Sequence, residues 1–61
     1  MLKQERIRLM EESIAQKGFA SMEDLCSTFS ISINTARADV RDLVKAGRAR
    51  KAYGGVSYEQ I

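Results

Sequence analysis

Residues 21–58 read SMEDLCSTFSISINTARADVRDLVKAGRARKAYGGVSY, and this stretch decides the fold. Its first part carries apolar side chains at the i, i+3, i+4 and i+7 positions of a helix, namely Met22, Leu25, Cys26 and Phe29. Ser21 precedes them as an N-cap, and Glu23 and Asp24 suit the positive end of a helix dipole. The pattern predicts a short helix over residues 22–29 that turns Cys26 toward the core.

A second helix follows the break formed by Ser30, Ile31 and Ser32. Ser32 is a suitable N-cap for a helix over residues 33–46, and Gly47 ends it. The apolar side chains of this helix share one face, which we expect to be buried: Ile33, Ala36, Val40, Leu43 and Val44. With about 3.6 residues per turn, the opposite face presents Asn34, Ala38, Arg41 and Lys45, flanked by Thr35 and Asp42 on one side and by Arg37 on the other.

The pattern changes to short strands after Gly47. Arg48–Tyr53 and Val56–Tyr58 predict two strands of a wing spanning residues 48–58, and Gly54-Gly55 between them permits the positive φ angles of a tight turn. Upstream, Phe19 and Ala20 are too few for a strand alone, but they can pair with this hairpin and close a small sheet.

The N-terminal part predicts one more helix, over residues 3–17. Ile7, Met10 and Ile14 recur on one face, and Gly18 ends the helix. Leu9 lies off this face, either as an ordinary exposed residue or as a contact for a partner. The fold class is therefore mainly α with a small β-hairpin: three helices followed by a two-stranded wing, the order of a winged helix-turn-helix.

The chain is 61 residues long, which allows one domain over residues 1–61 with a thin core and leaves little room for a pocket of enzyme dimensions. The sequence has no histidine and one cysteine, so we expect no enzyme, no cofactor, no metal site and no internal disulfide. It also lacks a signal peptide and an apolar run of roughly 18 residues, which favours a cytoplasmic protein without a membrane span. Residues 59–61 carry no element, and we expect the domain to be a fragment of a longer regulator.

Positive charge gathers in the second half of the chain. Residues 1–30 carry four basic and five acidic side chains, a net charge of −1, and residues 31–61 carry six basic and three acidic ones, a net charge of +3. Lys45, Arg48, Arg50 and Lys51 follow one another with no acid among them. Such a run favours a polyanionic partner, and the alternative is a solvated edge that discourages aggregation between strands.

The exposed face of the helix over residues 33–46 suits double-stranded DNA, because it is polar near its start and cationic further along. Asn34 can hydrogen-bond a base edge, Ala38 can touch a thymine methyl group, and Arg37 can reach guanine or phosphate. The expected DNA-binding residues are Ser32, Asn34, Thr35, Arg37, Ala38, Arg41, Lys45, Arg48, Arg50, Lys51, Tyr53, Gly54 and Gly55. Structural roles stay open for several of them: Ser32 as a cap alone, and Tyr53 as a cover for the core rather than a stacking group. We expect the wing to contribute more affinity and the helix more selectivity.

The two aspartates of this helix have different expected partners. Asp39 lies to the side of the exposed face and can pair with a cation inside the domain. Asp42 lies nearer the exposed face and can order Lys45 three residues on.

Four segments match a known family in order and spacing: MLKQERI at residues 1–7, SMEDLCSTFSIS at 21–32, TARADVRDL at 35–43 and YGGV at 53–56. The whole chain resembles the N-terminal winged helix-turn-helix domain of DeoR-type bacterial transcription regulators. That family usually shows Thr-Ile-Arg-Arg-Asp-Leu in the third segment and His-Gly-Gly-Ala in the fourth. Ala38 therefore replaces an arginine and Tyr53 a histidine, while Arg48 stands where an apolar residue is common.

The resemblance implies a repressor of sugar catabolism genes that binds an operator in double-stranded DNA. It also implies a larger C-terminal domain, outside these residues, that binds a sugar-phosphate effector and makes the protein a homo-oligomer. A second hypothesis is a winged-helix module for protein–protein interaction, motivated by the low total charge, Ala38 on the exposed face and an exposed Leu9.

Overall fold

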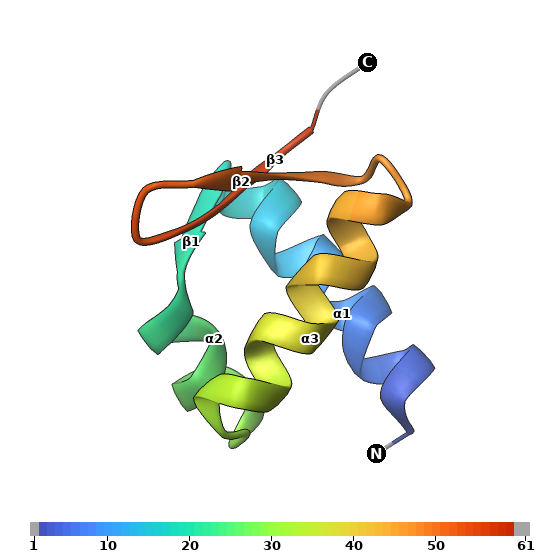
Figure 1. The fold of residues 1–61 in the computed structure, drawn as a ribbon, viewed down its shortest axis with the longest axis vertical. Coiled ribbons are helices and arrows are strands. Elements are labelled where there is room, and N and C mark those ends of the chain that lie inside the picture. Colours follow the sequence, from blue (N-terminus) through green and yellow to red (C-terminus); the bar gives the residue numbers. More distant parts are fainter. Residues whose placement is uncertain (1, 60–61) are drawn as a thin grey trace.

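Three helices and a three-stranded antiparallel sheet form the fold in the computed structural model, which describes residues 2–59 (Figure 1). The elements in chain order are α1 (Lys3–Lys17), β1 (Phe19–Ser21), α2 (Met22–Phe29), α3 (Ile33–Lys45), β2 (Ala49–Ala52) and β3 (Gly55–Tyr58). The predicted fold class is confirmed. The third helix ends one residue earlier than predicted, because Ala46 is its C-cap and Gly47 follows with a φ of 75°.

Local hydrogen bonds explain where α2 and α3 begin. The Ser21 hydroxyl accepts the backbone N–H of Asp24 at 3.0 Å, and the Ser32 hydroxyl accepts that of Thr35 at 3.2 Å. Both serines therefore act as the predicted N-caps. Helix α2 ends at Ser30, which takes the left-handed conformation with a φ of 53° and turns the chain toward α3.

The sheet confirms that residues 19 and 20 pair with the hairpin. Its strand order is β1-β3-β2, so β3 lies between β1 and β2. The turn differs from the prediction by one residue: Ala52 pairs with Gly55, so Tyr53 and Gly54 form the turn and Gly55 already belongs to β3. Arg48 lies before β2 rather than in it. In Figure 1 the hairpin runs across the C-terminal end of α3.

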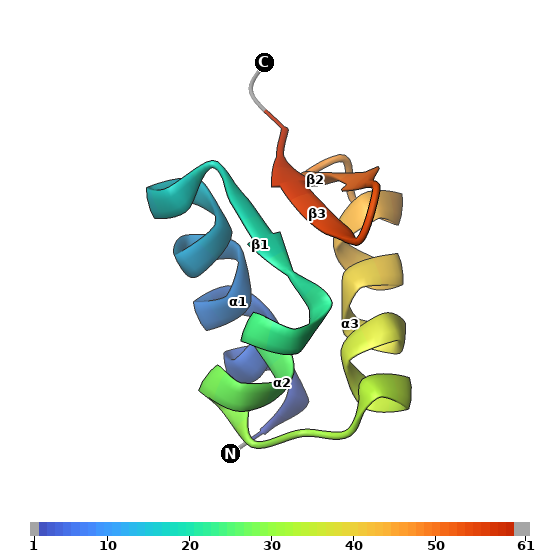
Figure 2. The ribbon, with the colours of Figure 1, turned by 90° about the vertical axis from the view of Figure 1, so that its left-hand side faces the viewer.

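The core joins all three helices and the sheet. Its largest fully buried apolar side chains are Met10 and Ile14 of α1, Leu25 of α2, Leu43 of α3 and Val56 of β3. Figure 2 shows α1 and α3 on opposite sides in that view, with α2 and β1 between them. Among residues 2–59, none of the helices has the length and apolar character that crossing a bilayer requires.

Two side chains of α3 that the sequence places in the core are exposed, Ile33 by 41% and Val44 by 38%. The buried face of α3 consists of Ala36, Asp39, Val40 and Leu43, so its centre lies nearer to Asp39 than the apolar pattern predicts. Ile33 and Val44 then lie at the edge of that face. The prediction for Cys26 is also too strong, because its side chain is only half-buried, whereas Ile31 packs against the core as expected.

Candidate nucleic-acid interface

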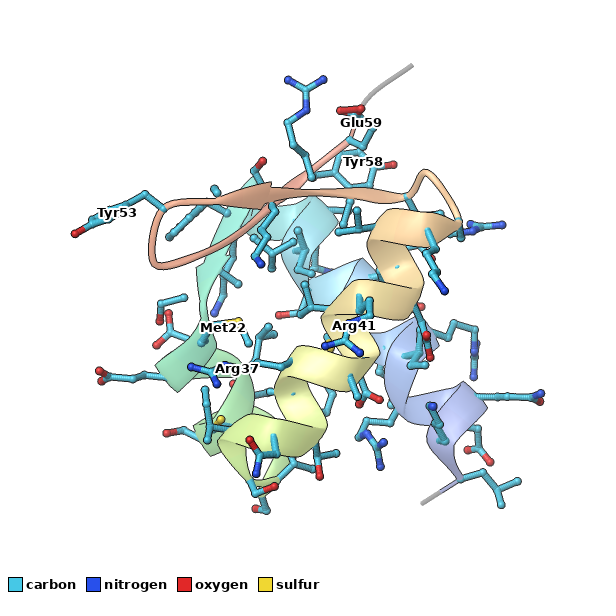
Figure 3. The ribbon with its side chains drawn as sticks, in the orientation of Figure 1. Met22, Arg37, Arg41, Tyr53, Tyr58 and Glu59 are labelled. Carbon is cyan, nitrogen blue, oxygen red and sulfur yellow. The ribbon has the colours of Figure 1, made fainter. Side chains whose placement is uncertain are left out.

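A groove of about 540 Å³ lies between α3, the start of α2 and the β2–β3 hairpin. Its lining comes from α2, α3 and the hairpin: Met22, Arg37, Val40, Arg41, Val44, Lys45, Lys51, Ala52, Gly54 and Gly55. In Figure 3, Arg37 and Met22 lie on the side of α3 next to α2, and Arg41 lies in front of the helix. A pocket of this size is not expected for so short a chain, but the groove has no carboxylate, histidine or thiol in its lining.

Four cations line this groove, and we call them the groove cations: Arg37, Arg41, Lys45 and Lys51. All four are exposed. Within residues 2–59, no ion pair ties any of them to a carboxylate. The surface that α3 and the wing build together suits a polyanion, because no carboxylate of the described residues neutralises its positive charge.

The other cations of the wing are engaged elsewhere. Arg48 forms an ion pair with Glu11 of α1, and Arg50 forms one with Glu59, each at 3.1 Å. Lys51 pairs in register with the fully buried Val56, which places it on the side of the sheet that faces the domain and the groove. Of the three predicted wing cations, only Lys51 therefore joins α3, and three of the four groove cations come from the helix.

The start of α3 carries the remaining predicted residues of the helix. Ser32 and Asn34 are exposed, and Thr35 and Ala38 are half-buried. The Ser32 hydroxyl donates to the Thr35 hydroxyl at 3.1 Å while accepting the Thr35 N–H, so both hydroxyls already have partners in the cap. None of these four residues lines the groove, whose α3 lining runs from Arg37 to Lys45.

At the wing tip, Tyr53 is fully exposed and points away from the domain (Figure 3). The alternative that Tyr53 covers the core is therefore wrong. Gly54 takes the positive φ of 74° that the turn requires, and its backbone oxygen accepts the N–H of Met22 at 3.3 Å. Gly55 is buried between β1 and β2, where it serves the packing of the sheet.

Both aspartates of α3 pair with cations of α1. Asp39 accepts two hydrogen bonds from Arg6, from Nε to Oδ2 at 2.5 Å and from Nη2 to Oδ1 at 3.1 Å, so its expected partner inside the domain is confirmed. Asp42 forms an ion pair with Lys3 at 3.2 Å, not with Lys45, because the start of α1 lies beside it. The hydrogen bond to Asp39 raises the pKa of Arg6, against the opposing effect of desolvation.

Sequence reasoning did not identify Arg6 as a partner of the site. No local pattern signals it, because Arg6 and Asp39 are 33 residues apart in sequence. It also did not assign Met22 and Val44 to an open groove, since both belong to apolar stripes. Within the described residues, no group of three or more His, Cys, Asp or Glu side chains is arranged to hold a metal ion.

Comparison with known proteins gives two matches. Residues 6–61 match the family profile described as the DeoR-like helix-turn-helix domain. Over 52 residues the chain is 44% identical to the HTH-type transcriptional regulator IolR of Bacillus subtilis (strain 168), an alignment that covers 85% of the chain and 21% of that regulator. The chain thus spans about a fifth of the length of this curated relative. No solved structure matches it.

Proposed function

The chain belongs to the DeoR-like helix-turn-helix family, and from this premise we propose that it binds double-stranded DNA with sequence preference, as a domain of a transcriptional regulator. The observation that carries the proposal is the set of groove cations. The family, the exposed face of α3 and a positive surface without a carboxylate partner in residues 2–59 all support DNA binding.

In this proposal α3 enters the major groove with its N-terminal half foremost. Asn34 and Arg37 face base edges, and Ala38 leaves room for a thymine methyl group. Arg41, Lys45 and the wing residue Lys51 then lie against phosphates of the backbone, since phosphate contacts position a protein on the duplex while base contacts specify the sequence. Ser32 and Thr35 sit at the helix start, where free backbone N–H groups can also meet a phosphate.

The wing contributes less to DNA affinity than its number of basic residues indicates. Arg48 and Arg50 pair with Glu11 and Glu59, so their positive charge is partly offset within the domain, although exposed pairs of this kind are weak. Tyr53 at the tip is free to stack on sugar or backbone. We therefore assign most of the affinity, as well as the selectivity, to α3 and Lys51.

Salt titration of DNA binding tests the proposal. Each phosphate that the domain neutralises contributes about 0.9 to the slope of log affinity against log salt. We expect Lys51→Ala to weaken all duplexes alike and to lower this slope by about one contact. The matched control is Lys17→Ala, which removes the same charge from the end of α1, outside the groove lining.

Base reading is tested by Arg37→Ala under the same conditions. We expect this variant to lose about 1–3 kcal/mol on a preferred duplex and less on a scrambled one. Binding that does not respond to salt, or equal losses from Arg37→Ala and Lys17→Ala, would contradict the proposal. The protein-interaction hypothesis predicts that salt-insensitive outcome. One observation in its favour, an exposed Leu9, does not hold, because Leu9 is half-buried.

We further propose that these residues are the DNA-binding part of a longer regulator that represses sugar catabolism genes. The support is the DeoR-like family and the relative, of which the alignment covers only 21%. In this view a C-terminal domain supplies oligomerisation and binds a sugar phosphate, and two modules occupy half-sites about one helical turn apart. The residues encoded after Ile61 test it: an α/β-patterned continuation is expected, and a natural stop codon would contradict it.

A further inference from the structure

The ion pair between Arg6 and Asp39 connects α1 to the middle of α3. Its two hydrogen bonds form a fork in which the guanidinium and the carboxylate face each other at 2.5 and 3.1 Å. The Asp39 side chain is 1% exposed and that of Arg6 is 16% exposed. A planar fork of this kind accepts only a narrow range of orientations between its two groups.

Asp39 lies where its ion pair can affect the orientation of the exposed side chains of α3. It is the one charged residue in the packed face of the helix within the described chain, beside the fully buried Ala36. Its neighbours in sequence, Arg37, Ala38 and Arg41, belong to the surface proposed to meet DNA. A rotation of α3 about its axis would move these side chains relative to a base and would also break the fork.

A second ion pair lies one turn away and has a different character. Lys3 and Asp42 meet at 3.2 Å, but their side chains are 57% and 47% exposed. Water can replace that contact at little cost, so it restrains α3 weakly. The buried fork is therefore the stronger of these two polar contacts, and it restrains how α1 and α3 are set against each other.

We propose that Arg6 is a positioning residue for DNA recognition: its fork with Asp39 fixes the rotation of α3 and so decides whether Asn34 and Arg37 meet base edges. This inference rests on the proposed function. It differs from a purely stabilising role, because a buried ion pair adds little stability over well-packed apolar side chains but restricts orientation more.

The test separates stability from sequence discrimination. Wild-type protein is used to enrich a duplex from a random-sequence library, and discrimination is the ratio of its affinity to that for a scrambled duplex. Two variants are compared below their melting temperatures: Arg6→Lys, which keeps the charge but loses the fork, and the apolar double variant Arg6→Met/Asp39→Leu. Lys3→Met is the matched control from the same helix, since it removes the exposed pair.

We expect the apolar double variant to melt close to the wild type while its discrimination falls about tenfold or more, as for one lost base contact. Arg6→Lys should lose discrimination as well, and Lys3→Met should keep it. Affinity for the scrambled duplex should change little in all three, because the groove cations remain.

A folded double variant that discriminates as well as the wild type would overturn the inference. If the double variant does not fold, Arg6→Lys decides, and full discrimination in that variant has the same meaning. An equal loss in Lys3→Met would also contradict it. A wild-type protein that enriches no sequence would instead contradict the proposed function, which is a distinguishable result.

Discussion

Gly55 shows how one missing side chain shapes the wing. A Cβ atom at this position would lie 2.3 Å from the backbone oxygen of Ala20 and 2.9 Å from the Phe19 ring. Both neighbours belong to β1, which pairs with β3 through Gly55 itself. Glycine is required at residue 55 because the strands approach closely there. At residue 54 there is open space, and glycine is favoured because φ is positive.

Gly55→Ala should therefore destabilise the domain more than Gly54→Ala. The first change forces β1 away from β3 and should cost about 2–3 kcal/mol, the upper part of the range for overpacking. The second places an alanine at a φ of 74° and should cost about 1 kcal/mol. Denaturant unfolding of both variants measures the difference, and equal losses would mean that the sheet relaxes freely around residue 55.

At the level of elements, Ser30 ends α2 in a conformation that suits glycine better than serine. Its φ of 53° and ψ of 49° are left-handed, and it is the one non-glycine residue with positive φ in the described chain. Its backbone N–H still bonds the oxygen of Cys26, which closes the last turn of the helix. The turn between α2 and α3 thus holds backbone strain that only residue 30 carries.

Ser30→Gly should stabilise the domain by about 0.5 kcal/mol. Relief of the left-handed strain contributes about 1–2 kcal/mol, and the greater freedom of glycine in the unfolded chain removes about 0.5–1 kcal/mol. Thermal unfolding measures the gain, and Ser27→Gly inside α2 is the control, which should lose stability. A lower melting temperature for Ser30→Gly would show that the serine side chain itself holds the turn.

Helix periodicity and caps were sufficient to predict most elements. Residues 3–17 and 22–29 form helices with the predicted bounds because Gly18 and Ser21 act locally. The buried face of α3 was predicted less well. The apolar pattern predicts that Ile33 and Val44 are buried, but burial of Asp39 depends on Arg6, a partner that only the folded chain brings near.

At the scale of the whole molecule, the core is small enough that each large side chain matters. A domain of 61 residues is expected to have a free energy of unfolding of about 3–9 kcal/mol. Leu43 is 2% exposed and joins α3 to the rest of the core. A single truncation at such a position removes a large share of the total stability.

Leu43→Ala should cost about 2–5 kcal/mol and leave the domain partly unfolded near body temperature. Because the unfolded fraction of molecules cannot bind at all, binding should weaken on preferred and scrambled duplexes alike. Leu2→Ala is the control, since Leu2 is 70% exposed and should change neither property. Circular dichroism on heating, with DNA titration at two temperatures, distinguishes unfolding from a local effect.

The candidate site could be predicted in part. The outer face of α3 follows from residue spacing, so Arg37, Arg41 and Lys45 were found from the sequence. The state of the wing cations was not, because Glu11 and Glu59 neutralise Arg48 and Arg50 only after α1 and the end of β3 are in place. Charge counted along the chain overstated the wing for this reason.

The position of the groove cations has a consequence for the kinetics of binding. The net charge is only +2, yet the four groove cations, which form no ion pair within residues 2–59, share one groove, so positive charge is concentrated on one side of the domain. A polyanion attracts this positive side of the domain at long range and orients it toward itself before contact. The rate of encounter should therefore fall steeply with added salt, while the lifetime of a complex held by base contacts should change much less.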